Sequence, residues 1–284
     1  MRWFEASPEH GLQRDIARQP WYPVEERYGL IFAYLGPPEK KPLVTRWDVL
    51  EDVGPTEKIW ASGASADAGG DHTVEIVPCN WLQDWENIMD PFHLPILHTN
   101  FSGTQFVPEF GIMPMVTWDY EPFGMRYTAY RKLDDGREVD RVTLALFPHV
   151  RIVPSVELKP GPATGVGWVV PVDDTHFRLF HAVRVPRDFV PREFRAYDGR
   201  LWSELSDEEH QRFPGDWGAQ VGQGEISWHS EETLAISDKG VVMLRRFMKE
   251  QIKTVQDGGD PLGVYFDSAK ALVKVASGNF FRAR

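Results

Sequence analysis

Alternating apolar and polar residues in the middle of the chain predict two antiparallel hairpins. The segments Met125–Leu133 and Val139–Phe147 flank Asp134-Asp135-Gly136, which favours a tight turn because aspartate and glycine tolerate the backbone angles required there. Val166–Val172 and Phe177–Val185 flank a second polar turn, and the last segment has an apolar residue at nearly every second position. The centre of the chain is therefore predicted to form an antiparallel sheet.

A long amphipathic helix is predicted close to the C-terminus. Its apolar residues recur every three to four positions, which places them on one helix face: Val241, Leu244, Met248, Ile252 and Val255. Ser237 or Asp238 can cap its first turn, and Gly258, Gly259 and Pro261 end it. The order of these elements predicts an α+β fold, an antiparallel sheet covered by this long helix.

Shorter segments complete the predicted architecture. Gly29–Leu35 is predicted to be a buried strand, and Thr73–Val77 alternates as another strand. Residues 81–90 favour a helix, and Ser206–Arg212 favours a second, short one. The sequence contains no internal repeat and no low-complexity tract.

Charge and cysteine content narrow the classes of function. The 284 residues include 31 basic and 42 acidic side chains, and a net charge of −11 argues against a nucleic-acid partner, which requires a basic surface. No apolar run reaches the roughly 18 residues that indicate a membrane-spanning helix, so no membrane span is expected. The single cysteine, Cys79, excludes a disulfide within the chain and fits a cytoplasmic location.

The strongest chemical signal follows the predicted helix at residues 81–90. His93 and His98 stand five positions apart, and Asp90 precedes the first of them. Two imidazoles with one distant carboxylate can occupy one face of an octahedral Fe(II), leaving the opposite positions open for O2 and water. On a regular helix residues five apart point about 140° apart. Pro91 and Pro95 are expected to break the helix, so that His98 turns back towards the metal.

Four segments in a fixed order are more specific than the histidine pair: Tyr22–Gly36, Asn80–Asn100, Gly215–Ile226 and Ser237–Arg246. The second segment resembles the iron-binding signature of Rieske-type ring-hydroxylating oxygenases, in the catalytic domain of their alpha (large) subunit. The first segment looks like the strand pair that closes the family's Rieske domain. The likeness is strongest to the phthalate dioxygenase and demethylase-like branch, whose oligomers contain alpha subunits only.

The resemblance implies a role for each matching residue. His93 and His98 correspond to the iron-binding histidines, and Asp216 corresponds to the family's carboxylate ligand. Asp90 corresponds to the aspartate that bridges the catalytic iron to a cluster ligand on a neighbouring subunit. Asn87 occupies the position of a nearby asparagine of this branch, so Asp90 and Asn87 are the implied catalytic residues.

Asp238 is the alternative third ligand. Its position at the start of the predicted C-terminal helix favours helix capping, so Asp216 is preferred. The segment around Asp216 departs from the family at Gly215, where glutamine is frequent, and at Glu225, where proline is frequent. Neither of these residues is an implied ligand, so the placement of Asp216 stands.

The cluster that supplies electrons in this family cannot be built from this sequence. A Rieske [2Fe-2S] cluster needs two cysteines and two histidines, and Cys79 is the chain's single cysteine. The resemblance therefore implies that residues 1–45 are the remnant of a Rieske-type domain with its linker, and that residues 46–284 form the catalytic domain for mononuclear Fe(2+). We expect a fragment of a longer protein, or a product started at an internal methionine; a separate polypeptide carrying the cluster is the alternative.

The resemblance implies a helix-grip, START-like fold and the function of a terminal oxygenase. Such a protein hydroxylates or O-demethylates an aromatic substrate with O2, using electrons from NAD(P)H through a reductase or ferredoxin and a Rieske cluster. A homotrimer or another homo-oligomer is expected, and the chain alone is expected to lack NADH-driven turnover. Two alternatives stay open. One is a non-catalytic helix-grip domain that binds an apolar ligand; the other is a zinc hydrolase using the same ligands, which the lack of an adjacent general base disfavours.

Two groups of residues are candidates for a substrate pocket. His181 lies on the apolar face of its predicted strand, where it either lines the pocket or is a hydrogen-bonded core histidine. Phe106, Phe180, Trp217 and Trp228 either wall an aromatic pocket or pack in the core. The sequence does not identify the substrate.

Overall fold

The computed structural model describes residues 21–63, 76–191, 200 and 204–282. Its main sheet contains β4 (Glu57–Ser62), β5 (Met115–Glu121), β6 (Gly124–Lys132), β7 (Glu138–Leu146), β8 (Val150–Ile152), β9 (Gly161–Pro162), β10 (Gly165–Asp173), β11 (His176–Pro186) and β13 (Gly278–Phe281). These nine strands are all antiparallel to their neighbours. The order is β4-β11-β10-β8-β7-β13-β9, with β6 pairing with β7 and β5 pairing with β6.

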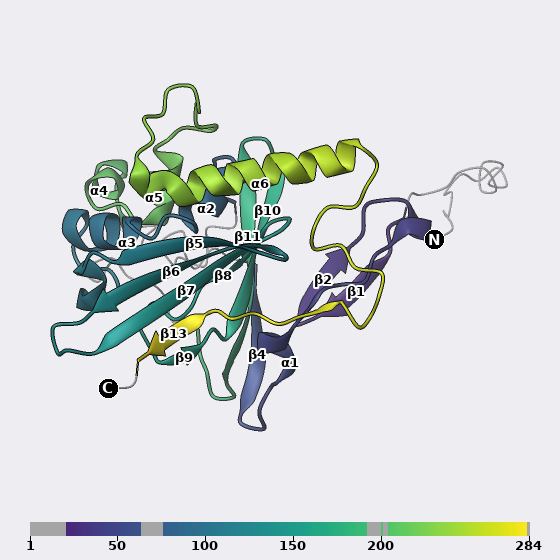
Figure 1. Cartoon of the computed structure of the whole chain (residues 1–284), viewed down its shortest axis with the longest axis horizontal. Coiled ribbons are helices and arrows are strands. Elements are labelled where there is room, and N and C mark those ends of the chain that lie inside the picture. The colour runs from purple at the N-terminus through teal and green to yellow at the C-terminus, as the bar shows by residue number, and fades with distance from the viewer. Residues whose placement is uncertain (1–20, 64–75, 192–199, 201–203, 283–284) are drawn as a thin grey trace, which may run out of the picture.

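The helical segments are mostly short, and the longest lies across the sheet (Figure 1). They are α1 (Asp48–Glu51), α2 (Trp81–Asn87), α3 (His93–Pro95), the π-helix η2 (Ile96–Phe101), α4 (Asp207–Arg212), α5 (Asp216–Val221) and α6 (Lys239–Gln256), with 3-10 turns η1 (Pro38–Lys40), η3 (Pro108–Gly111) and η5 (Ile236–Asp238). The predicted α+β fold, an antiparallel sheet with a long C-terminal helix, is confirmed.

Both predicted hairpins are present. β6 and β7 pair along their full lengths, and Gly136 in the turn between them has a φ of 82°, which glycine adopts without strain. β10 and β11 pair with one irregularity between Pro171 and Asp173, close to the second turn. Local alternation and turn chemistry were therefore sufficient to predict these four strands.

The two faces of the main sheet pack against different elements. On the first, which we call the helix-covered face, Met125 and Phe177 pack with Trp85 of α2 and Leu244 of α6. The second face, which we call the apolar face, carries a cluster of buried apolar residues. The cluster includes residues of α1 and the residue before α1: Trp47, Leu50, Leu144, Ile152, Val166 and Trp168. The candidate site lies on the helix-covered face.

Helix α6 occupies the predicted segment, but its cap and its burial differ from expectation. Asp238 stands at the N-cap position, yet its Oδ2 accepts a hydrogen bond from the backbone N of Ala235 at 2.6 Å and none from α6. Leu244 is fully buried, whereas Ile252 and Val255 are 49% and 52% exposed. The second half of the helix extends beyond the sheet (Figure 1). The predicted buried face is therefore confirmed for the first half of the helix only.

An N-terminal hairpin forms a separate two-stranded sheet of β1 (Val24–Arg27) and β2 (Leu30–Ala33). The expectation of a buried strand in this segment is wrong: Ile31 is 77% exposed, because a two-stranded ribbon packs on one side only. On its packed side, Phe32 meets Trp168 of the apolar face edge-on, with ring centroids 5.6 Å apart. The domain boundary after residue 45 stays a prediction.

Two further predicted elements have different outcomes. Residues 73–75 of the predicted strand Thr73–Val77 lie outside the described residues, and Val77 forms an isolated bridge with Phe177. The short helix is α4, which begins after Ser206; the Ser206 hydroxyl accepts a hydrogen bond from the backbone N of Glu209 at 3.3 Å.

A pair of short parallel strands, β3 (Arg46–Trp47) and β12 (Leu272–Val273), was not predicted. Across the described segments, every helix is too short or too polar to cross a membrane.

Candidate metal centre

His93 and His98 are brought together by a change of helix type. α3 begins at His93 and runs directly into the π-helix η2, which contains His98. At the end of η2 the backbone N of Ser102 donates a hydrogen bond to the carbonyl of Leu97, five residues earlier, at 3.0 Å. A turn closed after five residues brings positions five apart towards the same side of the helix axis. The two imidazole ring centroids lie 5.3 Å apart.

The two flanking prolines act differently from each other. Pro91 lies in the turn between α2 and α3, so it separates the helices as predicted. Pro95 does not break the chain's helical path, because α3 continues into η2 through it. It lies in the first turn of that continuous run, where backbone N–H groups have no helical partner and proline is tolerated. The return of His98 towards His93 therefore comes from the π-helix.

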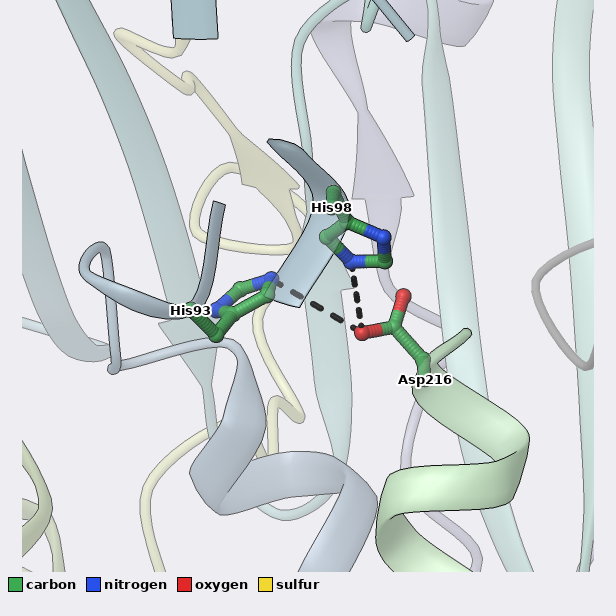
Figure 2. Close-up of side chains that lie close together, drawn as sticks. All are labelled: His93, His98 and Asp216. Atoms are coloured by element: carbon green, nitrogen blue, oxygen red, sulfur yellow. Dashed lines mark hydrogen bonds and ion pairs between the residues drawn. The ribbon is translucent and has the colours of Figure 1, made fainter. Parts of the chain in front are cut away.

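Asp216 reaches the histidines from α5, of which it is the first residue. Figure 2 shows its carboxylate directed at both rings: Oδ1 lies 3.0 Å from Nε2 of His98 and 3.8 Å from Nε2 of His93. One possible ligand atom from each of the three residues lies within 4.8 Å of the other two. The three residues selected from the sequence are thus adjacent in space, and their role as metal ligands stays a prediction.

Each of the two histidine rings is held in place by a hydrogen bond at its Nδ1 atom. Nδ1 of His98 hydrogen-bonds the side-chain oxygen of Gln105, and Nδ1 of His93 hydrogen-bonds the backbone carbonyl of Asp90. These oxygens only accept, so each Nδ1 carries a proton, and Nε2, which faces Asp216, is the nitrogen of each ring that is available to a metal. Metal-binding histidines are commonly held in this way, because the second contact fixes both the tautomer and the ring direction.

Asn87 and Asp90 contact the cluster in different ways. The side-chain amide of Asn87 donates to Oδ1 of Asp216 at 3.1 Å, so Asn87 orients the carboxylate directly. The carboxylate of Asp90 accepts a hydrogen bond from the backbone N of Phe92 at 2.9 Å, whereas its backbone carbonyl contacts His93. Burial raises the pKa of Asp90, and attraction to His93 opposes that rise.

The electrostatics of the cluster keep Asp216 ionised. Burial alone would raise the pKa of this carboxyl. Attraction to His98 and the hydrogen bond that His98 donates outweigh this effect, with further contributions from His93 and Asn87, and hold the pKa well below its usual range. Burial lowers the pKa of His98, and Asp216 reverses this effect, so the pKa of His98 is raised overall. An ionised carboxylate beside two imidazoles is a ligand set that can hold a divalent first-row metal ion.

Two residues besides the three candidate ligands and their predicted neighbours bear on the site, Asp238 and Gln105. The alternative ligand Asp238 binds the backbone of Ala235 and is not a member of the cluster. Gln105, which holds His98, was missed by the sequence analysis because it belongs to a loop and matches no motif. Its amide also donates to the carbonyl of Pro214 at 3.3 Å, which ties the histidine segment to the residues that precede α5.

Two cavities share part of their lining, and the smaller one adjoins the cluster. The smaller, of about 60 Å³, is lined by the three candidate ligands and by Phe106. It shares Arg151, Val153 and Val156 with a larger cavity of about 430 Å³, a size within the roughly 300–1,000 Å³ of small-molecule pockets. His181 lines this larger cavity, so its strand face borders a pocket rather than a closed core.

The four aromatic candidates do not form a common wall. Phe106 lines the small cavity and contacts the ring of His98, with centroids 4.7 Å apart. Phe180 packs on the apolar face, and Trp217 packs against the core of the helix-covered face. Trp228 is 73% exposed. The last three therefore serve packing or lie at the surface, as aromatic residues commonly do.

Sequence comparison decides the family. Phenoxybenzoate dioxygenase subunit alpha from Ectopseudomonas oleovorans is 51% identical to this chain over 277 residues, which cover 96% of this chain and 67% of that protein. The chain belongs to the family of Rieske-type oxygenase alpha subunits. This confirms the family that the sequence motifs indicated.

More distant relatives of this oxygenase family also align over most of the chain. The tert-butanol monooxygenase / tert-amyl alcohol desaturase oxygenase subunit from Aquincola tertiaricarbonis is 30% identical, covering 87% of this chain and 56% of that protein. The 5,5'-dehydrodivanillate O-demethylase oxygenase subunit from a Sphingobium species is 27% identical, covering 93% and 59%. No protein-family model matches the chain.

The alignment spans only part of each relative, from 56% to 67% of its length in these three. All three are oxygenase subunits by name, so the Rieske oxygenase family to which the chain belongs is a family of oxidoreductases. Membership of this family implies a mononuclear non-haem iron, and the cluster of His93, His98 and Asp216 lies within the aligned chain.

Proposed function

We propose that this chain is the catalytic part of a terminal oxygenase that hydroxylates or O-demethylates an aromatic substrate with O2. The observation that carries the proposal is the convergence of two Nε2 atoms and one carboxylate, with both rings fixed through Nδ1. An aromatic substrate is supported by the names of two relatives, a phenoxybenzoate dioxygenase and a dehydrodivanillate O-demethylase.

In this proposal His93, His98 and Asp216 hold one Fe(2+). The residues fit the ion, because two imidazoles and one carboxylate are the donor set of non-haem iron oxygenases. When bound, such an ion supplies the redox chemistry and the open positions at which O2 reacts. The chain's own contribution is to fix these three donors before the metal arrives.

Surrounding residues orient the donors and line a small cavity beside them. Gln105 and the carbonyl of Asp90 hold the two rings, and Asn87 holds Asp216 from the side of α2. Apolar side chains such as Leu94 and Phe106 line the small cavity together with the donors. Asn87 is therefore assigned as a positioning residue.

Electron delivery and assembly belong to the same proposal. We assign to Asp90 the link from His93 towards the electron donor, with NAD(P)H as the source, a reductase or ferredoxin as partner, and a homotrimer or another homo-oligomer as the assembly. A Rieske cluster does not fit the residues of this chain, because its one cysteine, Cys79, is buried and the cluster needs two cysteines. We derive no step through that cluster. Residues 1–45 remain the proposed Rieske remnant and residues 46–284 the proposed catalytic domain.

Iron content after anaerobic reconstitution tests the proposal. The full chain is expected to retain one Fe(2+), and His98→Ala or Asp216→Ala is expected to lose it while circular dichroism shows an unchanged fold. His176→Ala is the matched control, because this histidine pairs with Asp173 at an exposed turn. Full iron retention by His98→Ala would contradict the ligand assignment. Preferential zinc uptake would favour the hydrolase, and ligand binding without any metal would favour the binding module.

A further inference from the structure

Helix α5, which begins with Asp216, is too short to fix its own position. It contains six residues, and a helix of this length is not stable by itself, because few hydrogen bonds offset the cost of ordering its backbone. Contacts with neighbouring elements must therefore hold α5 in place. The same contacts determine where the carboxylate of Asp216 lies relative to the two histidine rings (Figure 2).

The C-terminal end of α5 is bonded to Gln83 of α2, a side chain that is buried. Carbonyls at the end of a helix lack their regular helical partner, so a side chain can bond them. The amide of Gln83 donates to the carbonyl of Gln220 at 2.9 Å and to the carbonyl of Gly224 at 3.1 Å. Its oxygen accepts from the backbone N of Ser227 at 3.2 Å. Both donors and the acceptor oxygen of this amide are therefore used on the end of α5 and the turn that follows it.

Two further hydrogen bonds join α2 to the same end of α5. Nε2 of Gln220 donates to Oδ1 of Asp84 at 3.2 Å, and both side chains are buried. The backbone N of Asn80, which precedes α2, donates to the carbonyl of Glu225 at 2.7 Å. The first turn of α2 and the end of α5 are thus bonded along their contact.

The N-terminal end of α5 is held by residues that follow η2. The hydroxyl of Ser102, also buried, donates to the carbonyl of Pro214 at 2.7 Å, and the amide of Gln105 donates to the same oxygen at 3.3 Å. Pro214 lies two residues before Asp216. Both ends of α5 are therefore bonded to one continuous segment, residues 80–105, which also contains both candidate histidine ligands.

We propose that Gln83 and Ser102 are positioning residues that hold α5 at its two ends and so place Asp216 within reach of the two histidines. This rests on the proposed metal centre and names residues on which its geometry depends. Both side chains bond backbone carbonyls, so they act on the carboxylate of Asp216 through the helix. The groups of a metal site must be held within roughly 0.5 Å of their productive positions, so a shift of α5 is expected to weaken metal binding.

Metal affinity and the absorption spectrum of bound Co(2+) test this assignment in the full chain. Gln83→Leu removes the amide and should weaken Fe(2+) binding by roughly 10-fold in anaerobic competition with a chelator, as changes around metal ligands commonly do. It should also shift the ligand-field bands of Co(2+), because these bands report how the ligands are arranged. Ser102→Ala removes one donor and leaves that of Gln105, so it should fold and show smaller changes in the same direction.

Two control variants separate the position of α5 from general stability. Gln251→Leu removes a side-chain oxygen of α6 that accepts from the backbone N of Leu262 at 3.0 Å. It should lower thermal stability but keep the iron affinity and the Co(2+) spectrum of the wild type, because a change in folded fraction does not alter the spectrum of the folded molecules. Gln223→Leu makes the same substitution at an exposed position beside the end of α5 and should match the wild type in all three measurements.

Amide hydrogen exchange in the metal-free chain provides a measurement that does not depend on iron. The backbone N–H groups of Ala219 and Gly222 donate within α5 to the carbonyls of Gly215 and Gly218, each at 3.0 Å. Both amides should exchange faster in Gln83→Leu and, to a smaller extent, in Ser102→Ala, whereas the amides of the β6–β7 hairpin should keep their wild-type rates.

The outcomes distinguish this inference from the proposed function. Wild-type exchange in α5 and a wild-type Co(2+) spectrum in both variants would overturn the inference alone, and so would an equal loss of iron affinity in Gln251→Leu. A wild-type chain that retains no metal would refute the proposed function. The exchange rates of α5 then decide by themselves whether Gln83 and Ser102 hold this helix.

Discussion

Arg151 and Ile152 are neighbours on β8 and lie on opposite faces of the sheet, in very different surroundings. Ile152 is fully buried in the cluster of the apolar face, beside residues such as Trp168. Arg151 is almost as well hidden, at 6% exposed, but it bonds His181 and pairs with Asp84. One strand therefore supplies apolar packing to one face and a buried charge to the other.

The comparison separates what stabilises the fold from what equips the site. Burial of apolar surface contributes favourably to folding at roughly 25 cal/mol per Å². A buried ion pair brings a desolvation cost that its attraction often fails to offset. The helix-covered face nevertheless contains buried polar side chains that line the small cavity at the candidate metal centre: His98, Arg141, Thr143 and Arg151. Their concentration there is better explained by binding than by stability.

The largest expected effect is on the apolar face. Ile152→Ala removes a fully buried side chain and should lower the free energy of unfolding by about 2–5 kcal/mol, whereas the control Ile152→Val should lower it by about 0.5–1.5 kcal/mol. Urea denaturation measures both. Iron content should persist where the variant is folded. A loss of iron as large as that of His98→Ala would show that the two faces are not separable.

The second effect concerns the ion pairs that join α2 to α6. Arg245 donates to Glu86 through Nε at 2.5 Å and Nη2 at 2.7 Å, and it also pairs with Glu232. Arg245→Met leaves Glu86, 8% exposed, without its cation and should cost about 1.5–3 kcal/mol of stability. Glu86→Gln combined with Arg245→Met should recover part of that loss. Strict additivity in this double-mutant cycle would mean that the pair contributes no coupling.

The sequence could predict what depends on local pattern. Period-two alternation and Asp134-Asp135-Gly136 placed β6 and β7 correctly, because strand alternation and turn chemistry are properties of neighbouring residues. The grouping of His93, His98 and Asp216 came from the family motifs, and the structure brings these residues together. Composition or spacing alone would not have selected Asp216 among 42 acidic residues.

Features that depend on contacts between distant segments could not be predicted. Gln105 supports His98 only because its loop folds back over η2. The row of Arg151, Gly167 and His181 requires the register of three strands, two of which are not consecutive in the chain. The exposure of Ile31 likewise follows from the number of strands in its sheet, which its own sequence does not determine.

The third expected effect tests the helix-covered face with a variant that leaves all three candidate ligands in place. Gln105→Leu removes the acceptor that fixes the ring of His98 and should weaken iron affinity by about 10- to 100-fold. Competition with a chelator under anaerobic conditions measures this. Gln223→Leu, at an exposed position near the end of α5, is the control and should bind iron as the wild type does. Unchanged iron affinity in Gln105→Leu would mean that His98 does not need its hydrogen bond to Gln105 in order to bind iron.

The smallest expected effect lies where the N-terminal hairpin meets the apolar face. The hydroxyl of Tyr28 donates to Glu51 at 2.6 Å and accepts from the backbone N of Trp47 at 3.0 Å, so Tyr28→Phe should cost about 1 kcal/mol. Burial and the bond to Glu51 raise the pKa of Tyr28 to about 12, above the ordinary value of about 10.

The sign of the resulting pH dependence follows from this rise in pKa. The folded state retains the phenolic proton more strongly than the unfolded state, so stability from this group is present below about pH 10. It is lost as the pH approaches about 12. Denaturation curves at increasing alkaline pH should therefore show a steeper loss for the wild type than for Tyr28→Phe. Tyr22→Phe, at a half-exposed tyrosine of the same segment, should follow the wild type. Parallel curves for all three proteins would mean that this hydroxyl does not couple the hairpin to the apolar face.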